Sequence, residues 1–266
     1  MPWRRTRSEP VNAPAASQAG KTLPGKTLLF GLGLGPGDPD YMTVRARDIL
    51  LKADRLVHFC KRGRRGNLRT CLDALVPPDP AREIALAFPV TTEAAVGEPD
   101  YDGPIAAFYD EAAEQLAGEM AQGRSLAVLC DGDPFFYGSF MHLWRRLAHR
   151  YPTEIVPGVT AMAGAWAQAQ VPITWGDDVL TVLPGTLPEA ELTRHLADTD
   201  AAVVMKLGRN LPKVRRALAR AGLIDRAIYV ERATMANQLV TRLADKGDDE
   251  APYFAVVLVP GEGRRL

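Results

Sequence analysis

The sequence contains few of the residues that form metal and disulfide sites. Only three cysteines, Cys60, Cys71 and Cys130, and four histidines occur in 266 residues. The cysteines are odd in number, widely spaced and never paired as CxxC, which argues against a disulfide framework or a structural zinc site. We therefore expect no metal site and a reducing compartment, the cytoplasm.

The chain also lacks net charge and long apolar runs. Its 32 lysines and arginines balance 32 aspartates and glutamates, so no overall positive field draws it to nucleic acid or to an anionic membrane. No run approaches the roughly 18 consecutive apolar residues of a membrane-spanning helix. Residues 1–25 lack the apolar segment of a signal peptide, and we expect them to form a disordered tail.

From Lys26 onward, short apolar runs alternate with longer amphipathic ones, the rhythm of an α/β fold. Because most of the short runs are almost continuously apolar, we expect parallel strands covered on both faces. The expected strands are 27–32, 55–59, 125–130, 154–156, 179–183, 201–206, 226–231 and 253–259. The expected helices are 42–53, 104–122, 138–149, 160–169, 188–197 and 210–221.

Two segments suggest how the chain is divided. Residues 76–103 hold five prolines and little periodicity, so we expect a long irregular excursion there. A second series of strands and helices starts near 152–160, which places a domain junction in that region. We therefore expect an N-terminal α/β domain over 26–155 and a C-terminal one over 156–266.

Three glycine turns follow predicted strands. The first turn is GLGLGPGDPDYMT at 31–43, the second is DGDPFFYGS at 131–139, and the third is EIVPGVTAMAGA at 154–165, where Thr160 is the expected N-cap of a helix. Open α/β sheets bind ligands beyond the carboxyl ends of their strands. The three turns are therefore expected to share one binding site.

The chemistry of these turns limits the ligand. The first turn fails the dinucleotide pattern GxGxxG, because Asp38 stands in the sixth position counted from Gly33, and the phosphate-binding pattern GxxxxGK[ST] is absent. Aspartates without a lysine would repel a phosphate. Backbone at a Gly-Pro-Gly turn can still approach a flat ligand closely. We therefore expect a neutral or cationic ligand.

In their order and residues, these turns resemble the motifs of the tetrapyrrole methylases, which methylate corrin precursors and related rings with S-adenosylmethionine. The resemblance runs from about Lys26 to Arg264. It implies two α/β domains with the cofactor in the cleft between them, and commonly a homodimer. Four further segments are similar to the branch of the family that methylates carbon 20 of precorrin-2: FPVTT at 88–92, VVMKLGRNLPKV at 203–214, YVERATMANQ at 229–238 and PYFAVVLV at 252–259.

The resemblance also implies site residues. S-adenosylmethionine has a sulfonium cation and no phosphate, which suits acidic glycine turns. The implied cofactor-binding residues are Pro36, Gly132, Asp133, Tyr137, Thr160, Ala161, Met205, Ala233, Thr234 and Ala255. For Asp133 two roles stay open, pairing with the cofactor or capping its own turn.

The implied substrate is a polycarboxylate, so cations are expected at the mouth of the site. The candidates are Lys61, Arg62, Arg64, Arg65, Lys206, Arg209 and Arg232. No residue is nominated as the base that removes the C20 proton.

The alternatives left open differ in the acceptor or in the activity. One is the cobalt-containing ring, cobalt-factor II. Others are ribosomal RNA or a diphthamide precursor as acceptor on the same fold, although the balanced charge weighs against RNA. The last is a non-catalytic nucleotide-binding module.

Overall fold

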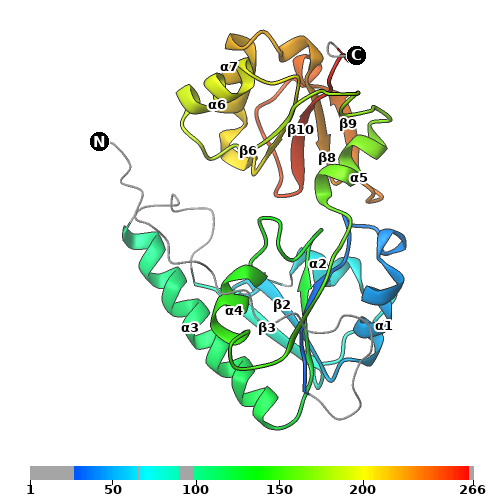
Figure 1. The fold of residues 1–266 in the computed structure, drawn as a ribbon, viewed down its shortest axis with the longest axis vertical. Coiled ribbons are helices and arrows are strands. Elements are labelled where there is room, and N and C mark those ends of the chain that lie inside the picture. Colours follow the sequence, from blue (N-terminus) through cyan, green and yellow to red (C-terminus); the bar gives the residue numbers. More distant parts are fainter. Residues whose placement is uncertain (1–26, 65, 90–98, 264–266) are drawn as a thin grey trace.

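The computed structural model describes residues 27–64, 66–89 and 99–263. Within these ranges the chain forms two α/β domains, and Figure 1 shows them one above the other, joined by the segment that follows β5. The expected tail at 1–25 and the candidate Arg65 lie outside the described residues. No helix among the described residues is long and apolar enough to span a membrane.

The first sheet is entirely parallel, with strand order β3-β2-β4-β1-β5. Its strands are β1 (Leu29–Gly33), β2 (Arg55–Lys61), β3 (Glu83–Phe88), β4 (Leu126–Cys130) and β5 (Thr153–Val156). β1 and β4 are central and buried along their whole length. Their carboxyl ends carry the first and second turns.

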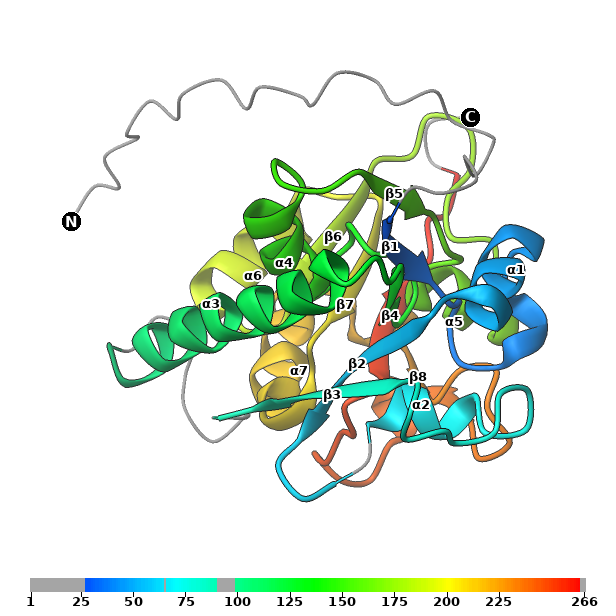
Figure 2. The same ribbon diagram turned by 90° about the horizontal axis from the view of Figure 1, so that it is seen from below.

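Helices cover both faces of this sheet (Figure 2). α3 (Pro99–Ala121) and α4 (Phe140–Leu147) pack on the face that presents Leu29 and Val128, whereas α1 (Val44–Lys52) packs on the opposite face against Phe30 and Leu129. The alternation of neighbouring residues between two cores is the period-two geometry of a strand buried on both sides.

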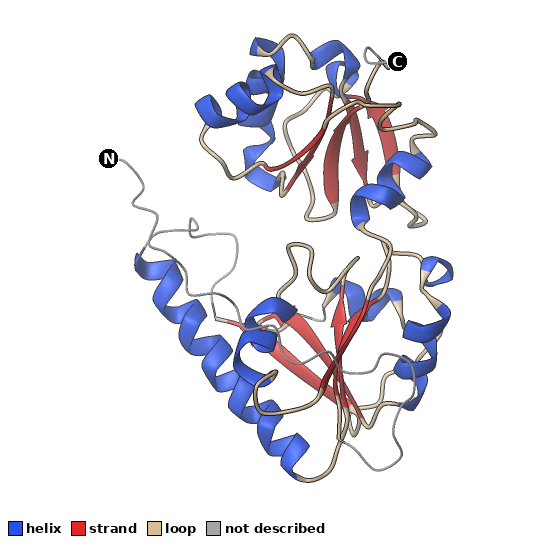
Figure 3. Ribbon diagram, viewed as in Figure 1, coloured by secondary structure: helices blue, strands red, loops and turns tan. Residues whose placement is uncertain are grey.

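The second sheet has strand order β6-β7-β10-β8-β9. Its strands are β6 (Leu180–Pro184), β7 (Ala201–Met205), β8 (Ile228–Glu231), β9 (Leu239–Arg242) and β10 (Ala255–Val259). α6 (Glu189–Ala197) and α7 (Leu211–Arg220) pack on one face, and α5 (Ala161–Gln168) packs on the other against Val203 and Val256. Figure 3 shows the helices in blue and the strands in red, so that the layers of each domain can be distinguished. Among the described residues, short 3-10 helices also occur at Pro39–Tyr41, Gly208–Asn210, Ile224–Arg226 and Leu243–Asp245.

The second sheet corrects the expectation of parallel strands. β10 runs antiparallel to both β7 and β8, and β8 pairs antiparallel with β9. Continuous apolar runs mark strands covered on both faces, and they do not report strand direction. β9 itself was missed, because its residues are largely exposed and lack an apolar run.

The expected irregular excursion at 76–103 is also wrong in part. β3 lies inside it, and α3 begins at Pro99 rather than at 104, with Pro104 inside the helix. The missed helix α2 (Asn67–Cys71) is tied to β3 by Arg69, whose wholly buried guanidinium donates to Glu83 Oε1 at 2.7 Å and to the Val76 carbonyl at 2.8 Å. This long-range pairing has no local signal in the sequence.

The expected domain boundary at 155/156 stays a proposal. It falls within β5, the edge strand of the first sheet, whose last residue is Val156. α5 begins five residues later and packs on the second sheet. We propose that the segment 157–160 links the two domains.

Candidate functional site

The three glycine turns meet beyond the carboxyl ends of β1, β4 and β5. The first and second turns are bridged, and the Gly132 amide donates to the Gly35 carbonyl at 2.9 Å. The third turn packs against both, because a Cβ added to Gly158 would lie 2.0 Å from the Gly132 carbonyl oxygen and 2.9 Å from Gly33 Cα. Only glycine allows three backbones to approach so closely. The predicted convergence of the three turns is confirmed.

Asp133 fixes the second turn and binds it to the third. Its Oδ1 accepts from the Phe135 amide at 2.8 Å, and its Oδ2 accepts from the Gly158 amide at 3.1 Å. The capping role left open by the sequence is therefore present. A carboxylate oxygen has capacity for a further bond, so a contact to the cofactor stays a prediction.

The third turn leads into α5 through the expected cap. Thr160 Oγ1 accepts from the Ala163 amide at 3.4 Å, which confirms the N-cap. Within the described part of the chain, the amides of Ala161 and Met162 donate to no protein acceptor. The N-terminus of α5, the positive end of its dipole, lies beside Gly132, since a Cβ added there would lie 3.3 Å from the Ala161 nitrogen.

The Thr160 cap provides a test of local stability. Replacing Thr160 by alanine should lower the free energy of unfolding by about 0.5–2 kcal/mol, because one amide in the first turn of α5 loses its acceptor. Thr160→Ser keeps the hydroxyl and should retain most of that stability. Urea unfolding followed by circular dichroism measures both variants, and equal stability of the alanine and serine variants would contradict the capping role.

Residues of the second domain lie against the first turn. The Asp38 amide donates to Thr234 Oγ1 at 3.0 Å, and a Cβ on Gly37 would lie 2.6 Å from Met235 Cε. Across the same junction, Lys206 Nζ lies 5.0 Å from the centre of the Tyr137 ring. The structure thus brings predicted site residues of both domains together.

Backbone strain is concentrated at the same junction. Five non-glycine residues in the described ranges have a positive φ, and four of them are predicted site residues: Tyr137 (55°), Lys206 (56°), Arg232 (48°) and Thr234 (69°). A residue held there costs about 1–3 kcal/mol, and such strain clusters at ligand sites. The observed strain supports a functional role for this junction.

Three side chains at this junction are exposed, and desolvation shifts the pKa of each. Asp131, Lys206 and Tyr253 are all exposed, yet desolvation raises the pKa of Asp131 to about 6, lowers the pKa of Lys206 and raises the pKa of Tyr253. Asp131 and Tyr253 also interact electrostatically, although they belong to different domains. Together with the contacts of Asp38 with Thr234 and of Lys206 with Tyr137, these groups place the candidate site at the junction of the two domains.

The other predicted cofactor residues pack against different parts of the two domains. Pro36 packs on α5, because a Cβ on Gly164 would lie 2.5 Å from Pro36 Cβ. Met205 and Ala233 pack on the α5 side of the second sheet. Ala255 belongs to the opposite core, with α6 and α7, so any contact it makes with a cofactor must come from its main chain.

The predicted substrate-binding cations differ in their location and in whether they are already paired with an acidic residue. Lys61, Arg62 and Arg64 are exposed. Lys61 is the last residue of β2 and the two arginines follow it, at the edge of the sheet where the turns lie. Arg209 is exposed on the 3-10 helix after β7. Arg232 is already paired with Glu231, which also accepts from the Tyr229 hydroxyl at 2.6 Å. These assignments stay predictions.

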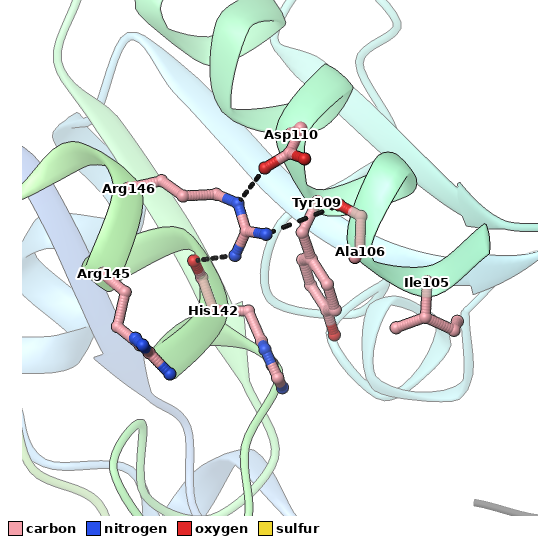
Figure 4. Close-up of a pocket in the computed structure, with 7 residues that line it drawn as sticks. All are labelled: Ile105, Ala106, Tyr109, Asp110, His142, Arg145 and Arg146. Carbon is pink, nitrogen blue, oxygen red and sulfur yellow. Dashed lines mark hydrogen bonds and ion pairs between the residues drawn. The ribbon is translucent and has the colours of Figure 1, made fainter. Parts of the chain in front are cut away.

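Two features of the site were not predicted from the sequence. One is Asp131, which directly precedes Gly132 and whose carboxylate has no hydrogen-bond or ion-pair partner in the described ranges. The other is a pocket of about 470 Å³ between α3 and α4, shown in Figure 4 and lined by Ile105, Ala106, Tyr109, Asp110, His142, Arg145 and Arg146. A second pocket, of about 430 Å³, lies beside Arg232 and Lys246.

Metal chemistry has no visible basis in the described residues. Among them, no group of three or more histidine, cysteine, aspartate or glutamate side chains could hold an ion. Cys60, Cys71 and Cys130 are free thiols, and burial raises the pKa of each. They are therefore poor nucleophiles and poor metal ligands.

Comparison with known proteins gives consistent matches. Residues 28–245 match the model of the family described as Tetrapyrrole (Corrin/Porphyrin) Methylases. A precorrin-2 C(20)-methyltransferase of Sinorhizobium sp is 56% identical, covering 88% of this chain and 95% of that relative. A cobalt-precorrin-2 C(20)-methyltransferase of Salmonella typhimurium is 32% identical, covering 87% and 95%.

Solved structures show the same fold. A cobalt precorrin-4 methyltransferase, CbiF, matches with a TM-score of 0.64 at 23% identity, covering 88% of this chain and 94% of that one. A uroporphyrin-III C-methyltransferase from Thermus thermophilus, complexed with S-adenosylhomocysteine, matches with a TM-score of 0.59 at 20% identity, covering 89% and 97%. At such identities the likeness concerns the fold alone.

Proposed function

The chain belongs to the tetrapyrrole (corrin/porphyrin) methylase family, and on that premise we propose that it methylates carbon 20 of precorrin-2, giving precorrin-3A in cobalamin biosynthesis. The observation that carries this proposal is the 56% identity to a precorrin-2 C(20)-methyltransferase over almost its full length. The meeting of three glycine turns at one edge of the first sheet supplies the binding site that such a reaction requires.

The residues at the turns fit S-adenosylmethionine. The three turns carry Asp38, Asp40, Asp131 and Asp133 but no lysine or arginine, which favours a sulfonium or ammonium cation over a diphosphate. Their remaining acid, Glu154, is already paired with Arg45. The open amides of Ala161 and Met162 can donate to a carboxylate at the N-terminus of α5. When bound, S-adenosylmethionine supplies an activated methyl group on a positively charged sulfur.

The structure supports catalysis mainly by positioning. Holding two reactants at attack distance can contribute about 7–11 kcal/mol of the barrier. The turns are joined by hydrogen bonds, and Tyr137 and Thr234 are already held in a strained backbone conformation. Such a site needs little reordering when ligands bind. The protein's role in the attack of C20 on the methyl carbon is therefore to align the two and to exclude water.

We propose that Asp131 accepts the C20 proton. It directly precedes Gly132 in the second turn and interacts electrostatically with Tyr253 of the second domain. Its carboxylate has no protein partner in the described ranges, and its pKa of about 6 leaves it ionised at neutral pH. With both reactants bound, the C–C bond would form as the C–S bond broke, with the bonding pair of the C–S bond staying on the sulfur of the donor. The C20 proton then passes to the carboxylate, the C–H electron pair returns to the ring, and Asp131 releases the proton to water.

The metal-free ring is the preferred substrate in this proposal. Identity is 56% to the relative named for precorrin-2 and 32% to the one named for cobalt-precorrin-2. The candidate cations for the substrate's carboxylates are Lys61, Arg62, Arg64, Arg65, Lys206, Arg209 and Arg232. We further propose a cytoplasmic location, which the three free thiols support, and no nucleic-acid or membrane partner, which the balanced charge supports. A homodimer is proposed from the family resemblance alone.

Methyl transfer tests the proposal directly. The purified protein is incubated with S-adenosylmethionine carrying a ¹³C-labelled methyl group, together with precorrin-2 or its cobalt complex. We expect one labelled methyl on C20 of the metal-free ring, identified by NMR of the product, and slower transfer to the cobalt ring. Absence of transfer to either ring would overturn the proposed function, whereas faster transfer to the cobalt ring would reverse the substrate preference.

A further inference from the structure

The pocket between α3 and α4, here called the α3–α4 pocket, has a wall that is held in place. Arg146 Nε donates to Asp110 Oδ1 at 2.6 Å, and its two terminal nitrogens donate to the carbonyls of His142 at 3.0 Å and Ala106 at 3.4 Å. The same guanidinium lies 5.8 Å from the centre of the Tyr109 ring. Arg146 thus joins the two helices and neutralises Asp110, so neither group is available to a ligand.

Arg145 differs from its neighbour. It lines the same pocket and is exposed, and within the described ranges it makes no hydrogen bond or ion pair with the protein. The His142 ring stacks on Tyr109, with centroids 4.3 Å apart. In Figure 4 the ends of Arg145, His142 and Tyr109 point in the same direction, away from the Arg146–Asp110 pair. The open side of the pocket is therefore bordered by an imidazole and by a guanidinium that has no partner among the described residues.

The pocket has an excess of positive charge. The pKa of His142 is lowered by desolvation and further by Arg146, Arg145 and Lys206. Among the described residues that line the pocket, Asp110 is the one acidic side chain, and Arg146 already engages it. A carboxylate entering the pocket would meet a net positive field and a donor without a partner.

The α3–α4 pocket also borders the site between the domains. Lys206, which acts on His142, follows β7 in the second domain and lies over Tyr137 of the second turn. Tyr109 acts electrostatically on Tyr253, just before β10 of the second domain. A molecule held between the domains can therefore extend a side arm to this pocket. Its volume of about 470 Å³ lies near the low end for small-ligand sites, roughly 300–1,000 Å³, and so suits an arm better than a whole macrocycle.

We propose that the α3–α4 pocket is a subsite for one carboxylate arm of the tetrapyrrole, with Arg145 donating to the carboxylate and the His142 ring beside it. This inference rests on the proposed function, since a polycarboxylate ring must occupy the site between the domains. Arg145 was not among the predicted substrate cations. The subsite selects for a carboxylate at the matching position of the ring and positions the ring without taking part in bond formation.

The test compares two matched variants with sirohydrochlorin as the probe, a metal-free ring carrying the same carboxylate arms as precorrin-2. Arg145→Gln removes the proposed donor. Arg150→Gln removes an equal charge from the far end of the α4 region, where Arg150 pairs with Glu114 of α3. We expect Arg145→Gln to weaken sirohydrochlorin binding about 10-fold or more, in absorbance titrations, because a charge-assisted hydrogen bond is lost. Arg150→Gln should bind like the wild type, and both variants should bind S-adenosylhomocysteine normally.

A spectroscopic measurement separates a subsite from a merely structural role. Adding sirohydrochlorin to the wild type should raise the pKa of His142, followed by NMR of its ring proton, and the rise should be smaller in Arg145→Gln. Unchanged affinity in Arg145→Gln, or no rise in the wild type, would overturn the subsite while methyl transfer by the wild type still upheld the proposed function. Failure of the wild type to bind any ring would overturn both.

Discussion

Replacing Asp131 by asparagine is expected to lower kcat for methyl transfer by a factor of about 10² to 10⁴, the usual contribution of a general base. The amide keeps the shape of the side chain but cannot accept the C20 proton. In the wild type kcat should also fall as the pH drops through about 6, where the carboxylate becomes protonated. The variant should lack this dependence. Steady-state kinetics between pH 5 and 8 measure both effects.

Although Asp131→Asn is expected to lower kcat, it should raise the stability of the folded protein at pH 7.5. Desolvation raises the pKa of Asp131 above its usual value of 3.8 to about 6, so the folded protein binds this proton more tightly than the unfolded chain does. The group therefore favours folding at low pH, and that contribution is lost as the pH rises through about 6. At pH 7.5 the variant should be more stable than the wild type, and this advantage should shrink toward pH 4.

Asp48→Asn is the matched control, because it removes an exposed carboxylate from α1, outside the three turns. Its kcat should stay within about twofold of the wild type, as expected for a surface substitution. Full activity of Asp131→Asn at pH 7.5 would remove Asp131 from the mechanism. A loss of activity accompanied by lower stability at that pH would point instead to a structural role.

Gly158→Ala is expected to weaken binding of S-adenosylhomocysteine by at least about 100-fold. The added Cβ would lie 2.0 Å from the Gly132 carbonyl oxygen, so the second and third turns must separate. The hydrogen bond from the Gly158 amide to Asp133 Oδ2, which joins the two turns, would be strained or lost as they separate. Overpacking costs about 1–3 kcal/mol where side chains can adjust, and here backbone meets backbone, which places the cost at the top of that range or above. Isothermal titration calorimetry measures the affinity.

Gly118→Ala provides the control for a glycine substitution. Gly118 lies in α3 with nothing within 4 Å of an added Cβ, so the change should leave the affinity unaltered. It should stabilise the protein by about 0.5–1 kcal/mol through helix propensity. If Gly158→Ala bound the ligand as tightly as Gly118→Ala, the packed turns would not form the binding site.

Local sequence patterns predicted the parts of the fold that depend on short-range chemistry. Glycine turns after apolar runs predicted the meeting of Gly35, Gly132 and Gly158, because parallel strands end at a common edge. Thr160 before an apolar segment predicted the cap of α5. In each case the residue type itself determines the backbone geometry or the hydrogen bond.

The missed features depend on partners distant in sequence. β3 and α2 are held by the pairing of Arg69 with Glu83, and the direction of β10 is set by its neighbours in the sheet. The α3–α4 pocket requires Tyr109 and His142 to stack across two helices. The spacing of His142 and Arg145 on one helix face was the available signal, but it did not indicate what α4 packs against.

Asp131 was missed for a different reason. Its neighbours Gly132 and Asp133 carried the motif, and nothing in the sequence distinguishes a carboxylate that caps a turn from one that faces the space between the domains. Only the structure separates Asp133, which accepts from two amides, from Asp131, which has no such partner in the described ranges. The raised pKa of Asp131 follows from that placement.

The proposed reaction requires that the three glycine turns form the binding site for the methyl donor. A crystal structure of the protein with S-adenosylhomocysteine tests it most directly. We predict density for the ligand between the domains, in contact with Gly132, Thr160 and Ala161. Ligand bound elsewhere, or none at these turns at a saturating concentration, would contradict the account.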